Sequence, residues 1–407
     1  MRERWHLITP EYPPQPGGVS DYTQLVARGL ATAGDIVHVW CPGSGDVTTD
    51  VSGVSVHREM GSFRTANLRR TGRLLDRLPR PRRLLVQWVP HGYGRRSMNV
   101  AFCLWLWQRS RVSGDRVELM VHEPFLAFGE GSRTQDAAAA VHRVMVAVLL
   151  RAARRVWVSI PAWKRAWRPY ALGRPVPFTW LPVPSNVPVV NDTAGVHAVR
   201  ARFTASGELL VGHFGTVGGG IEQPLRSAIV AVLRRRADTR VILIGHGGAA
   251  VHERLVREHP DLGKRVIATG ALAGADVSRH LSACDIMLQP YPDGVSARRT
   301  SAMAGLAHRR AIVTTAGRLT EPLWAESAAV TLVPASDPSA LADAALALLA
   351  DARERQRLGA AAAELYQDRF DLRHTITALR DSAADTVTDA GRGSVKRDAP
   401  ALGVTGA

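Results

Sequence analysis

Cysteine is scarce in this chain of 407 residues, which contains only three. Cys41, Cys103 and Cys284 lie far apart, and no CxxC pair or cysteine–histidine cluster accompanies them. This pattern argues against a disulfide framework and a structural zinc site, and it fits a reducing cytoplasm. The longest apolar runs, residues 99–107 and 144–150, are far shorter than the ~20 residues of a membrane-spanning helix. We therefore expect a cytoplasmic protein that is soluble or lies on the inner surface of a membrane.

Acidic residues are under-represented in the first half of the chain. The whole chain has 52 Lys and Arg against 36 Asp and Glu, and a net charge of +16. Residues 1–190 account for +13 of this charge, and residues 191–407 for +3. An anionic partner should therefore meet the first half. Because no helix-turn-helix, RNP or zinc-finger signature is present, we do not expect that partner to be a nucleic acid.

Short apolar runs alternate with helical stretches in two series, separated by a Pro-, Asn- and Gly-rich segment at 182–195. Such runs are typical of parallel sheets covered on both faces. We therefore predict an α/β fold of two doubly wound, Rossmann-like domains that face a cleft. The predicted units are a first domain at 1–188, a second at 189–370, a C-terminal helix at 371–388 packed back on the first domain, and a disordered tail at 389–407. The predicted strands are 6–10, 36–41, 54–58, 84–89, 117–122 and 156–160, then 209–214, 241–244, 266–268, 286–289, 311–314 and 330–333.

Two loops in the first half could contribute to a site, because ligands bind at the carboxyl ends of such strands. Gly17 and Gly18 precede a predicted helix, where bare amides and the helix dipole favour an anion. A tight turn with a helix cap is the alternative, and the absence of GxGxxG and GxxxxGK[ST] argues against a dinucleotide or Walker site. His122 ends a strong apolar strand and could bind a hydroxyl or phosphate, or move a proton. A histidine whose hydrogen bonds are satisfied within the protein is the alternative.

Two further loops follow strands of the second half. The Gly-rich segment 213–220, which includes Gly215, would let main-chain amides approach a ligand closely, unless it is only a structural turn. Asp293 lies in the loop after 286–289, and Arg298 and Arg299 follow at the start of a helix. Arginine there opposes the helix dipole, so a bound anion would account for the pair. A solvated helix face is the alternative.

These four loops together resemble the family 4 glycosyltransferases of the B-type fold. The resemblance covers residues 5–380 and is carried by ITPEYPPQPGGVSDYTQLVARGLATAGDIVHVW at the start and PYPDGVSARRTSAMAGLAHRRAIVTT near the end. It implies a retaining transferase that uses a nucleotide sugar as donor, with no metal and no other cofactor. It implies catalytic roles for His122 near the transferred sugar and Asp293 on sugar hydroxyls. It further implies that Gly17, Gly18 and Gly215 lie near the donor diphosphate, and Gly245, Gly247 and Ser301 near the nucleotide.

The sequence departs from that family pattern in two places. Ser301 stands where the family has a second glutamate, so a contact to the ribose is weaker or is made elsewhere. The basic pair expected after strand 209–214 is absent, and GTVGGGIEQP stands there instead. Arg298 and Arg299 are the nearby candidates to bind the donor diphosphate in its place.

The expected function is transfer of a sugar to a glycan, a lipid-linked acceptor or a small molecule, in the synthesis of cell-envelope polysaccharides. A B-type epimerase, a phosphorylase, a nucleic-acid-binding protein and a scaffold without activity are alternatives. Neither Lys164 nor Lys264 lies in a Gly-rich cofactor loop, which argues against a pyridoxal-dependent phosphorylase. Eight arginines between residues 64 and 83, and the segment 163–168 with two tryptophans, make an anionic membrane surface a candidate partner for the first domain.

Overall fold

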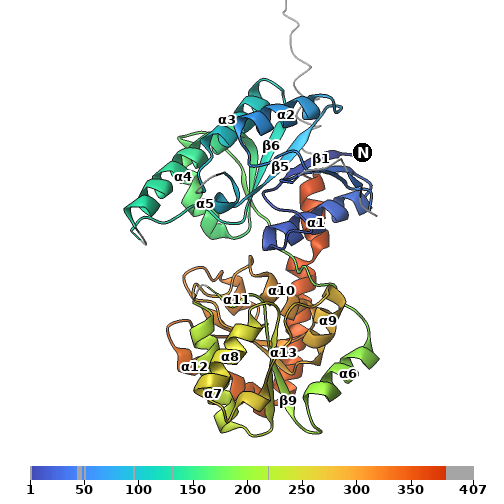
Figure 1. The fold of residues 1–407 in the computed structure, drawn as a ribbon, viewed down its shortest axis with the longest axis vertical. Helices are drawn as coiled ribbons and strands as arrows, with labels where there is room; N and C mark the ends of the chain where they lie inside the picture. The colour runs from blue at the N-terminus through green and yellow to red at the C-terminus, as the bar shows by residue number, and fades with distance from the viewer. Residues whose placement is uncertain are drawn as a thin grey trace, which may run out of the picture.

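The computed structural model of the protein describes residues 2–43, 48–49, 52–94, 97–129, 132–218 and 220–381. Two α/β domains are stacked along the long axis of the molecule (Figure 1). Each is built on a sheet of parallel strands with helices on both faces, apart from one antiparallel pair at the edge of the first sheet. The predicted fold class is therefore confirmed.

The first sheet has the strand order β3-β4-β2-β1-β5-β6-β7-β8, so the order reverses between β1 and β5. Its central strands are short and mostly buried, and in β5 all six residues are buried, which is why these strands appear in the sequence as apolar runs. The strands are β1 (Arg4–Ile8), β2 (Ile36–Trp40), β3 (Thr48–Thr49), β4 (Ser55–His57), β5 (Arg83–Trp88), β6 (Arg116–Val121), β7 (Ala153–Val158) and β8 (Phe178–Trp180). The helices are α1 (Gly18–Thr32), α2 (Thr65–Asp76), α3 (Val100–Arg111), α4 (Arg133–Ala152) and α5 (Pro161–Trp167), with 3₁₀ turns at Pro90–Gly92 and Arg168–Ala171.

The second sheet has the order β11-β10-β9-β12-β13-β14 and reverses between β9 and β12. Ligands of doubly wound sheets bind at such reversal points, beyond the carboxyl ends of the strands. The strands are β9 (Leu209–Phe214), β10 (Thr239–Ile244), β11 (Val266–Ala268), β12 (Ile286–Gln289), β13 (Ala311–Ala316) and β14 (Thr331–Pro334). The helices are α6 (Thr193–Phe203), α7 (Glu222–Arg235), α8 (Gly248–Glu258), α9 (Gly274–Ala283), α10 (Thr300–Ala307), α11 (Leu323–Glu326), α12 (Pro338–Ala350) and α13 (Ala352–Leu365), with a 3₁₀ turn at Gly263–Arg265 and a π-turn at Tyr366–Phe370.

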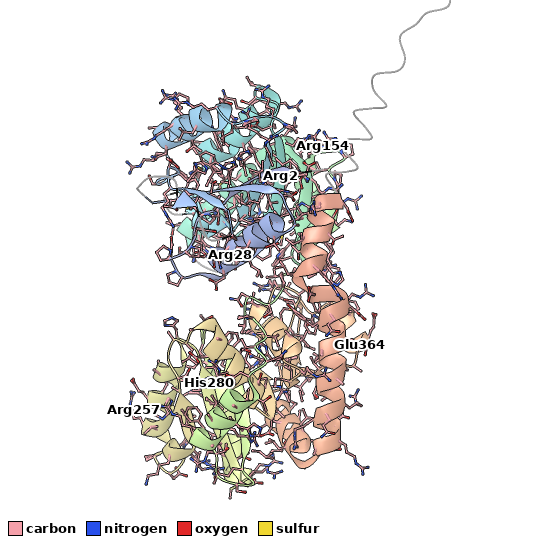
Figure 2. All side chains as sticks on the ribbon, turned by 90° about the vertical axis from the view of Figure 1, so that its right-hand side faces the viewer. Arg2, Arg28, Arg154, Arg257, His280 and Glu364 are labelled. Carbon is pink, nitrogen blue, oxygen red and sulfur yellow. The ribbon has the colours of Figure 1, made fainter. Side chains whose placement is uncertain are left out.

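The end of the described chain connects the two domains. After α13, Phe370 stacks on Trp324 of the second domain and meets Trp180 of the first edge-on. Residues 372–381 are helical and lie against α1 of the first domain (Figures 1 and 2). There Leu379 is buried in that domain's core, and Arg380 pairs with Asp35 at 3.2 Å. The predicted tail at 389–407 lies outside the described residues.

The predicted linker at 182–195 includes, at its C-terminal end, residues that belong to a helix. Helix α6 begins at Thr193, because the Asp192 side chain accepts a hydrogen bond from the Gly195 amide and caps the first turn. The three-residue strand β8 and the short helix α5 were not predicted from the sequence, since neither is long enough to show a periodic pattern.

Candidate active site

The loop after β1 folds back on the first turn of α1. The Glu11 carboxylate accepts hydrogen bonds from the amides of Val19 and Ser20, both at 3.0 Å. A Cβ at Gly17 would lie only 2.2 Å from that carboxylate, so a side chain there would displace it. At Gly18 no described atom lies within 4 Å of such a Cβ. Glu11 therefore satisfies two of the amides that the sequence suggested for an anion, and Gly18 faces open space.

His122 follows β6 and lies against α1, where its ring meets the edge of the Tyr22 ring with centroids 4.7 Å apart. Its Nε2 is 2.8 Å from Oε1 of Gln87, which lies on β5. Burial lowers the pKa of His122 to about 4, so the ring is uncharged at neutral pH. No other described residue hydrogen-bonds the ring, which leaves Nδ1 available to a substrate.

Glu123 and Arg298 connect the His122 loop to the loop after β12. Nη1 of Arg298 is 3.9 Å from Glu123 Oε1, and its Nη2 is 3.5 Å from Asp293 Oδ2. The same guanidinium lies over the Trp163 ring of α5, 5.7 Å from its centroid. His91 contacts the other oxygen of Glu123 at 3.3 Å, and this hydrogen bond is the main cause of the lowered pKa of Glu123. Residues from both domains, including the predicted His122 and Asp293 loops, thus meet at one place.

Three arginines surround Asp293. Arg318 donates from Nε at 3.0 Å and from Nη2 at 2.9 Å, while Nη2 of Arg299 is 4.0 Å away. One carboxylate thus faces three guanidinium groups. The Nε atoms of Arg298 and Arg299 are buried and have no hydrogen-bond partner among the described residues. Burial is the main cause of the lowered pKa of Arg298, and the positive charge of Arg299 adds to it. This local excess of positive charge favours an anionic ligand.

Gly215, predicted to lie near the diphosphate, is close to residues predicted to lie near the nucleotide. Gly215 has φ +128°, and a Cβ there would lie 3.3 Å from the Ser301 side chain. A Cβ at Gly245, where φ is +112°, would lie 3.4 Å from the Gly215 carbonyl oxygen. A Cβ at Gly247 would lie 2.7 Å from the Val217 amide nitrogen, too close for any side chain. The 213–220 loop and the turn after β10 are therefore packed backbone to backbone, and glycine is required at these positions by the packing of the two loops.

Ser301 hydrogen-bonds within the protein. Its hydroxyl is 2.8 Å from that of Tyr291, and the Arg299 guanidinium lies over the Tyr291 ring, 4.7 Å from the centroid. The tyrosine thus connects the arginine pair to the glycine loop. Ser301 therefore hydrogen-bonds a protein residue, whereas the glutamate that the family resemblance implies at this position would contact the ribose.

A buried glutamate supports the segment that carries the arginines. Both carboxylate oxygens of Glu321 accept from the Ala297 amide, at 3.1 and 3.2 Å, and one accepts from Trp324 Nε1 at 2.9 Å. Burial is the main cause of the raised pKa of Glu321. These bonds fix the backbone one residue before Arg298.

Sequence reasoning missed several of these groups: Glu11, Gln87, His91, Glu123, Tyr291, Arg318 and Glu321. Glu11 lies in the first segment that carries the family resemblance, and Glu123 directly follows His122, so both could have been noticed as carboxylates next to predicted site residues. The contacts of Arg318 and Glu321 depend on the return of the chain after β13, which no local pattern encodes. No group of three or more His, Cys, Asp or Glu side chains in the described part of the chain is arranged to hold a metal ion.

Residues 209–351, most of the second domain, match the family model described as glycosyl transferases group 1. The protein is therefore an enzyme, a glycosyltransferase. Among solved structures, sucrose-phosphate synthase from Thermosynechococcus elongatus is similar, with a TM-score of 0.72, 17% identity and coverage of 95% of this chain and 100% of that one. HepE of Anabaena, in complex with UDP and glucose, has a TM-score of 0.68, 15% identity and coverage of 95% and 100%.

A third similar structure is WaaG, described as a glycosyltransferase involved in lipopolysaccharide biosynthesis, with a TM-score of 0.66, 15% identity and coverage of 95% and 99%. A search of curated proteins finds no match. At these identities the structural likeness establishes the B-type fold. Of the helices in the described ranges, none combines the length and apolar character that a membrane span needs.

Proposed function

We propose that the protein is a retaining, family 4 type glycosyltransferase that uses a nucleotide-diphosphate sugar. The observation that carries this proposal is the half-buried pair Arg298 and Arg299, whose buried Nε atoms have no hydrogen-bond partner among the described residues and which lie beside Asp293 and the His122 loop. The bound UDP in the HepE structure supports a nucleotide donor for the same fold. Guanidinium groups bind phosphate oxygens bidentately, and the pair supplies the positive charge that the 213–220 loop lacks.

In this proposal the donor spans the contacts described above. The base and ribose lie along Gly245 and Gly247, and the diphosphate lies near Gly215, between the arginine pair and the open space at Gly18. The Ser301 hydroxyl can contact the ribose only while it also hydrogen-bonds the Tyr291 hydroxyl. We expect no metal and no other cofactor, because the two guanidinium groups can balance the charge of the leaving diphosphate.

The transfer breaks the bond between the anomeric carbon and a diphosphate oxygen and forms one to an acceptor hydroxyl. The acceptor proton passes to the departing diphosphate, and the new bond forms on the face that the old one left. Neutral His122 hydrogen-bonds a hydroxyl of the transferred sugar through Nδ1, with Gln87 fixing its orientation. Asp293, held by Arg318, orients other hydroxyls of that sugar.

The acceptor is proposed to be a glycan or lipid-linked molecule of the cell envelope, and the protein to lie in the cytoplasm with a membrane surface as a peripheral partner. Some of the first-domain residues expected to face the membrane are buried in the structure. Trp163 and Trp167 are buried and donate to the carbonyls of His122 and Pro124, so they support the site instead of facing lipid. Arg82 and Arg83 are buried as well. The exposed arginines of the stretch are Arg64, Arg69, Arg70, Arg73, Arg77 and Arg80.

The test of donor binding is calorimetry with UDP, GDP and ADP. Arg298→Ala and Arg299→Ala should each weaken binding of the preferred diphosphate by roughly 1.5–3 kcal/mol, the value of a hydrogen bond to a charged group. Arg257→Ala, on the exposed face of α8, removes one positive charge elsewhere and should leave binding unchanged. Parent-like affinity in both site variants would refute the assignment.

The test of the reaction is release of nucleoside diphosphate from UDP-, GDP- and ADP-sugars, with the anomeric configuration of the first product read by proton NMR. Retention is expected. An inverted product would exclude the retaining mode, and absence of turnover with every donor and acceptor class would favour a scaffold.

Co-sedimentation with anionic and neutral vesicles tests the membrane role. Arg73→Gln/Arg77→Gln should reduce pelleting with the anionic ones, and equal pelleting with both lipids would remove the claim.

A further inference from the structure

A second basic site lies at the amino ends of the strands of the first sheet, whereas the cleft lies at their carboxyl ends. A pocket of about 590 Å³ opens where β6 and β7 begin, whereas the His122 loop lies where β6 ends. Six strand residues rise roughly 20 Å, so the pocket is separate from the cleft. Six arginines line it: Arg111, Arg116, Arg151, Arg154, Arg155 and Arg174. The volume is in the range of small-molecule sites.

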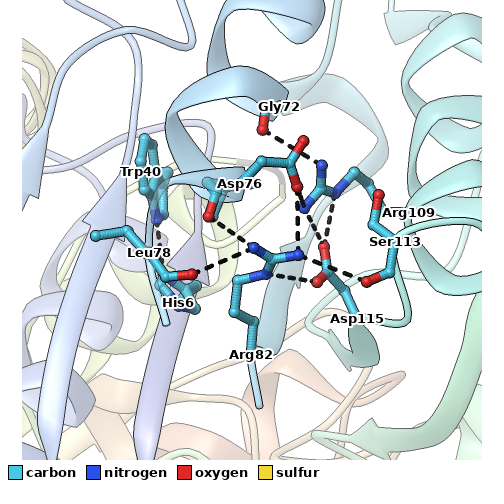
Figure 3. Close-up of polar contacts among 10 residues, drawn as sticks. His6, Trp40, Gly72, Asp76, Leu78, Arg82, Arg109, Ser113 and Asp115 are labelled. Atoms are coloured by element: carbon cyan, nitrogen blue, oxygen red, sulfur yellow. Dashed lines mark hydrogen bonds and ion pairs between the residues drawn. The ribbon is translucent and has the colours of Figure 1, made fainter. Parts of the chain in front are cut away.

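The two acids that line this pocket are already paired with arginines outside its lining. Asp115 accepts from Arg82 Nε at 2.7 Å and from Arg109 Nε at 2.6 Å, as Figure 3 shows. Glu118 forms an ion pair with Arg83 and accepts from Trp157 Nε1 at 2.8 Å. Both carboxylates are thus bound to cations outside the lining, and of the lining arginines Glu118 acts on Arg116, whose pKa it raises.

Five of the six lining arginines have no acidic partner among the described residues. Within the described residues, Arg111, Arg151, Arg154, Arg155 and Arg174 form no ion pair with an acid. Arg174 is held in place by the carbonyl oxygens of Leu150, at 2.7 Å, and Arg151 at the end of α4. Arg155 lies over the Trp157 ring, 5.2 Å from its centroid. At least two of the guanidinium groups are therefore pre-positioned by the fold.

The arginines of the pocket lie close enough to repel one another. The pKa of Arg174 is lowered by burial first, and then by the charges of Arg111 and Arg151. The pKa of Arg116 is lowered by burial and by the nearby Arg154. Crowded like charges raise the energy of the empty site, and an anion with several oxygens would relieve the repulsion.

We propose that this pocket is a binding site for a phosphate-bearing ligand, distinct from the donor site in the cleft. Its arginines present several N–H donors to one volume, which suits a phosphate or diphosphate group more than a single carboxylate. The phosphate could belong to a soluble ester or to a lipid headgroup, and the chemistry recognised is the same in both cases.

The experiment measures binding of inorganic pyrophosphate by calorimetry to the full-length chain. It is made in the Arg298→Ala/Arg299→Ala background, so the proposed donor site contributes little. Adding Arg151→Gln/Arg154→Gln should weaken binding about tenfold or more, because two charged donors are lost. The matched control is Arg257→Gln/Arg353→Gln, which removes two exposed charges from the second domain; Figure 2 shows Arg257 far from the first domain. Parent-like binding after the pocket change, or an equal loss in the control, would overturn the proposal.

Vesicles containing phosphatidylglycerol in phosphatidylcholine distinguish the two sources of phosphate. If Arg151→Gln/Arg154→Gln lowers both pyrophosphate affinity and pelleting with these vesicles, the ligand is a lipid headgroup. If it lowers pyrophosphate affinity alone, the ligand is a soluble phosphate ester. Binding of an oligonucleotide without binding of pyrophosphate would overturn the proposal in favour of a different class of partner. None of these outcomes depends on which donor the cleft uses.

Discussion

Asp115→Ala should destabilise the first domain far more than loss of one exposed acid would. The Asp115 side chain is 1% exposed and contacts two buried guanidinium groups, those of Arg82 (1% exposed) and Arg109 (5% exposed). Without it, the remaining acid near both arginines is Asp76, at 3.2 and 2.9 Å, and its side chain is half exposed. Figure 3 shows the four residues as one network.

The expected cost is about 3–5 kcal/mol, the usual result of removing one partner of a buried ion pair. The lower part of this range applies, because Arg82 also donates to the Leu75 carbonyl at 2.9 Å and Arg109 to that of Gly72 at 3.3 Å. For a domain of this size, each 1 kcal/mol lowers the melting temperature by roughly 2–4 °C, so a fall of about 6–12 °C follows.

Thermal unfolding followed by tryptophan fluorescence measures this change. The matched control is Asp343→Ala, which removes an acid paired with Arg235 at the surface, where the two side chains are 59% and 57% exposed. That change should cost less than about 1 kcal/mol. An Asp115→Ala protein that melts within 2 °C of the Asp343→Ala protein would refute the reasoning, because the buried arginines would then tolerate the loss of their partner.

Three further predictions concern the site and the buried histidines. His122→Ala should lower turnover by ~10²-fold or more with little change in melting temperature, since a preorganised group is lost; wild-type turnover would contradict this. Gly17→Ala should displace Glu11 from the α1 amides and reduce both stability and donor binding, whereas Gly18→Ala, with open space around it, should leave stability unchanged. Burial lowers the pKa of His6 to about 3 and of His57 to about 4, so below pH 6.5 the unfolded chain binds protons that the folded chain does not. Stability should fall as pH drops from 6.5 towards 4, by up to about 1.4 kcal/mol per unit for each histidine, and His57→Gln should reduce that slope.

The fold could be predicted from the sequence because parallel strands buried on both faces appear as apolar runs. All six residues of β5, for example, are buried, and five of them lie in the predicted run 84–89. The strand β8 has only three residues, and its pairing with β7 is set by the sheet, so no local signal predicts it. The start of α6 at Thr193 was not predicted, because the Asp192 side chain caps a helix within a segment whose composition is typical of loops.

The candidate site could be predicted only as a set of loops. Their contacts join residues far apart in sequence, such as Glu123 to Arg298 and Asp293 to Arg318, and depend on how the two domains stack. The sequence also could not show which arginines are exposed. The stretch 64–83 looked like one basic surface, yet Arg82 and Arg83 point into ion pairs with Asp115 and Glu118.

The positive charge of the first domain is best understood from where its acids are used. Asp35, Asp115 and Glu118 are all buried in ion pairs with arginine, and Asp76 contacts two buried guanidinium groups from the surface. Residues 151–190 contain seven Lys and Arg and no acid at all. The domain therefore uses several of its few carboxylates to bury arginines, and these acids contribute little negative charge to its surface. That imbalance creates a positive electrostatic field where the strands of the first sheet begin, separate from the cationic site in the cleft. Salt should therefore weaken the binding of anions there.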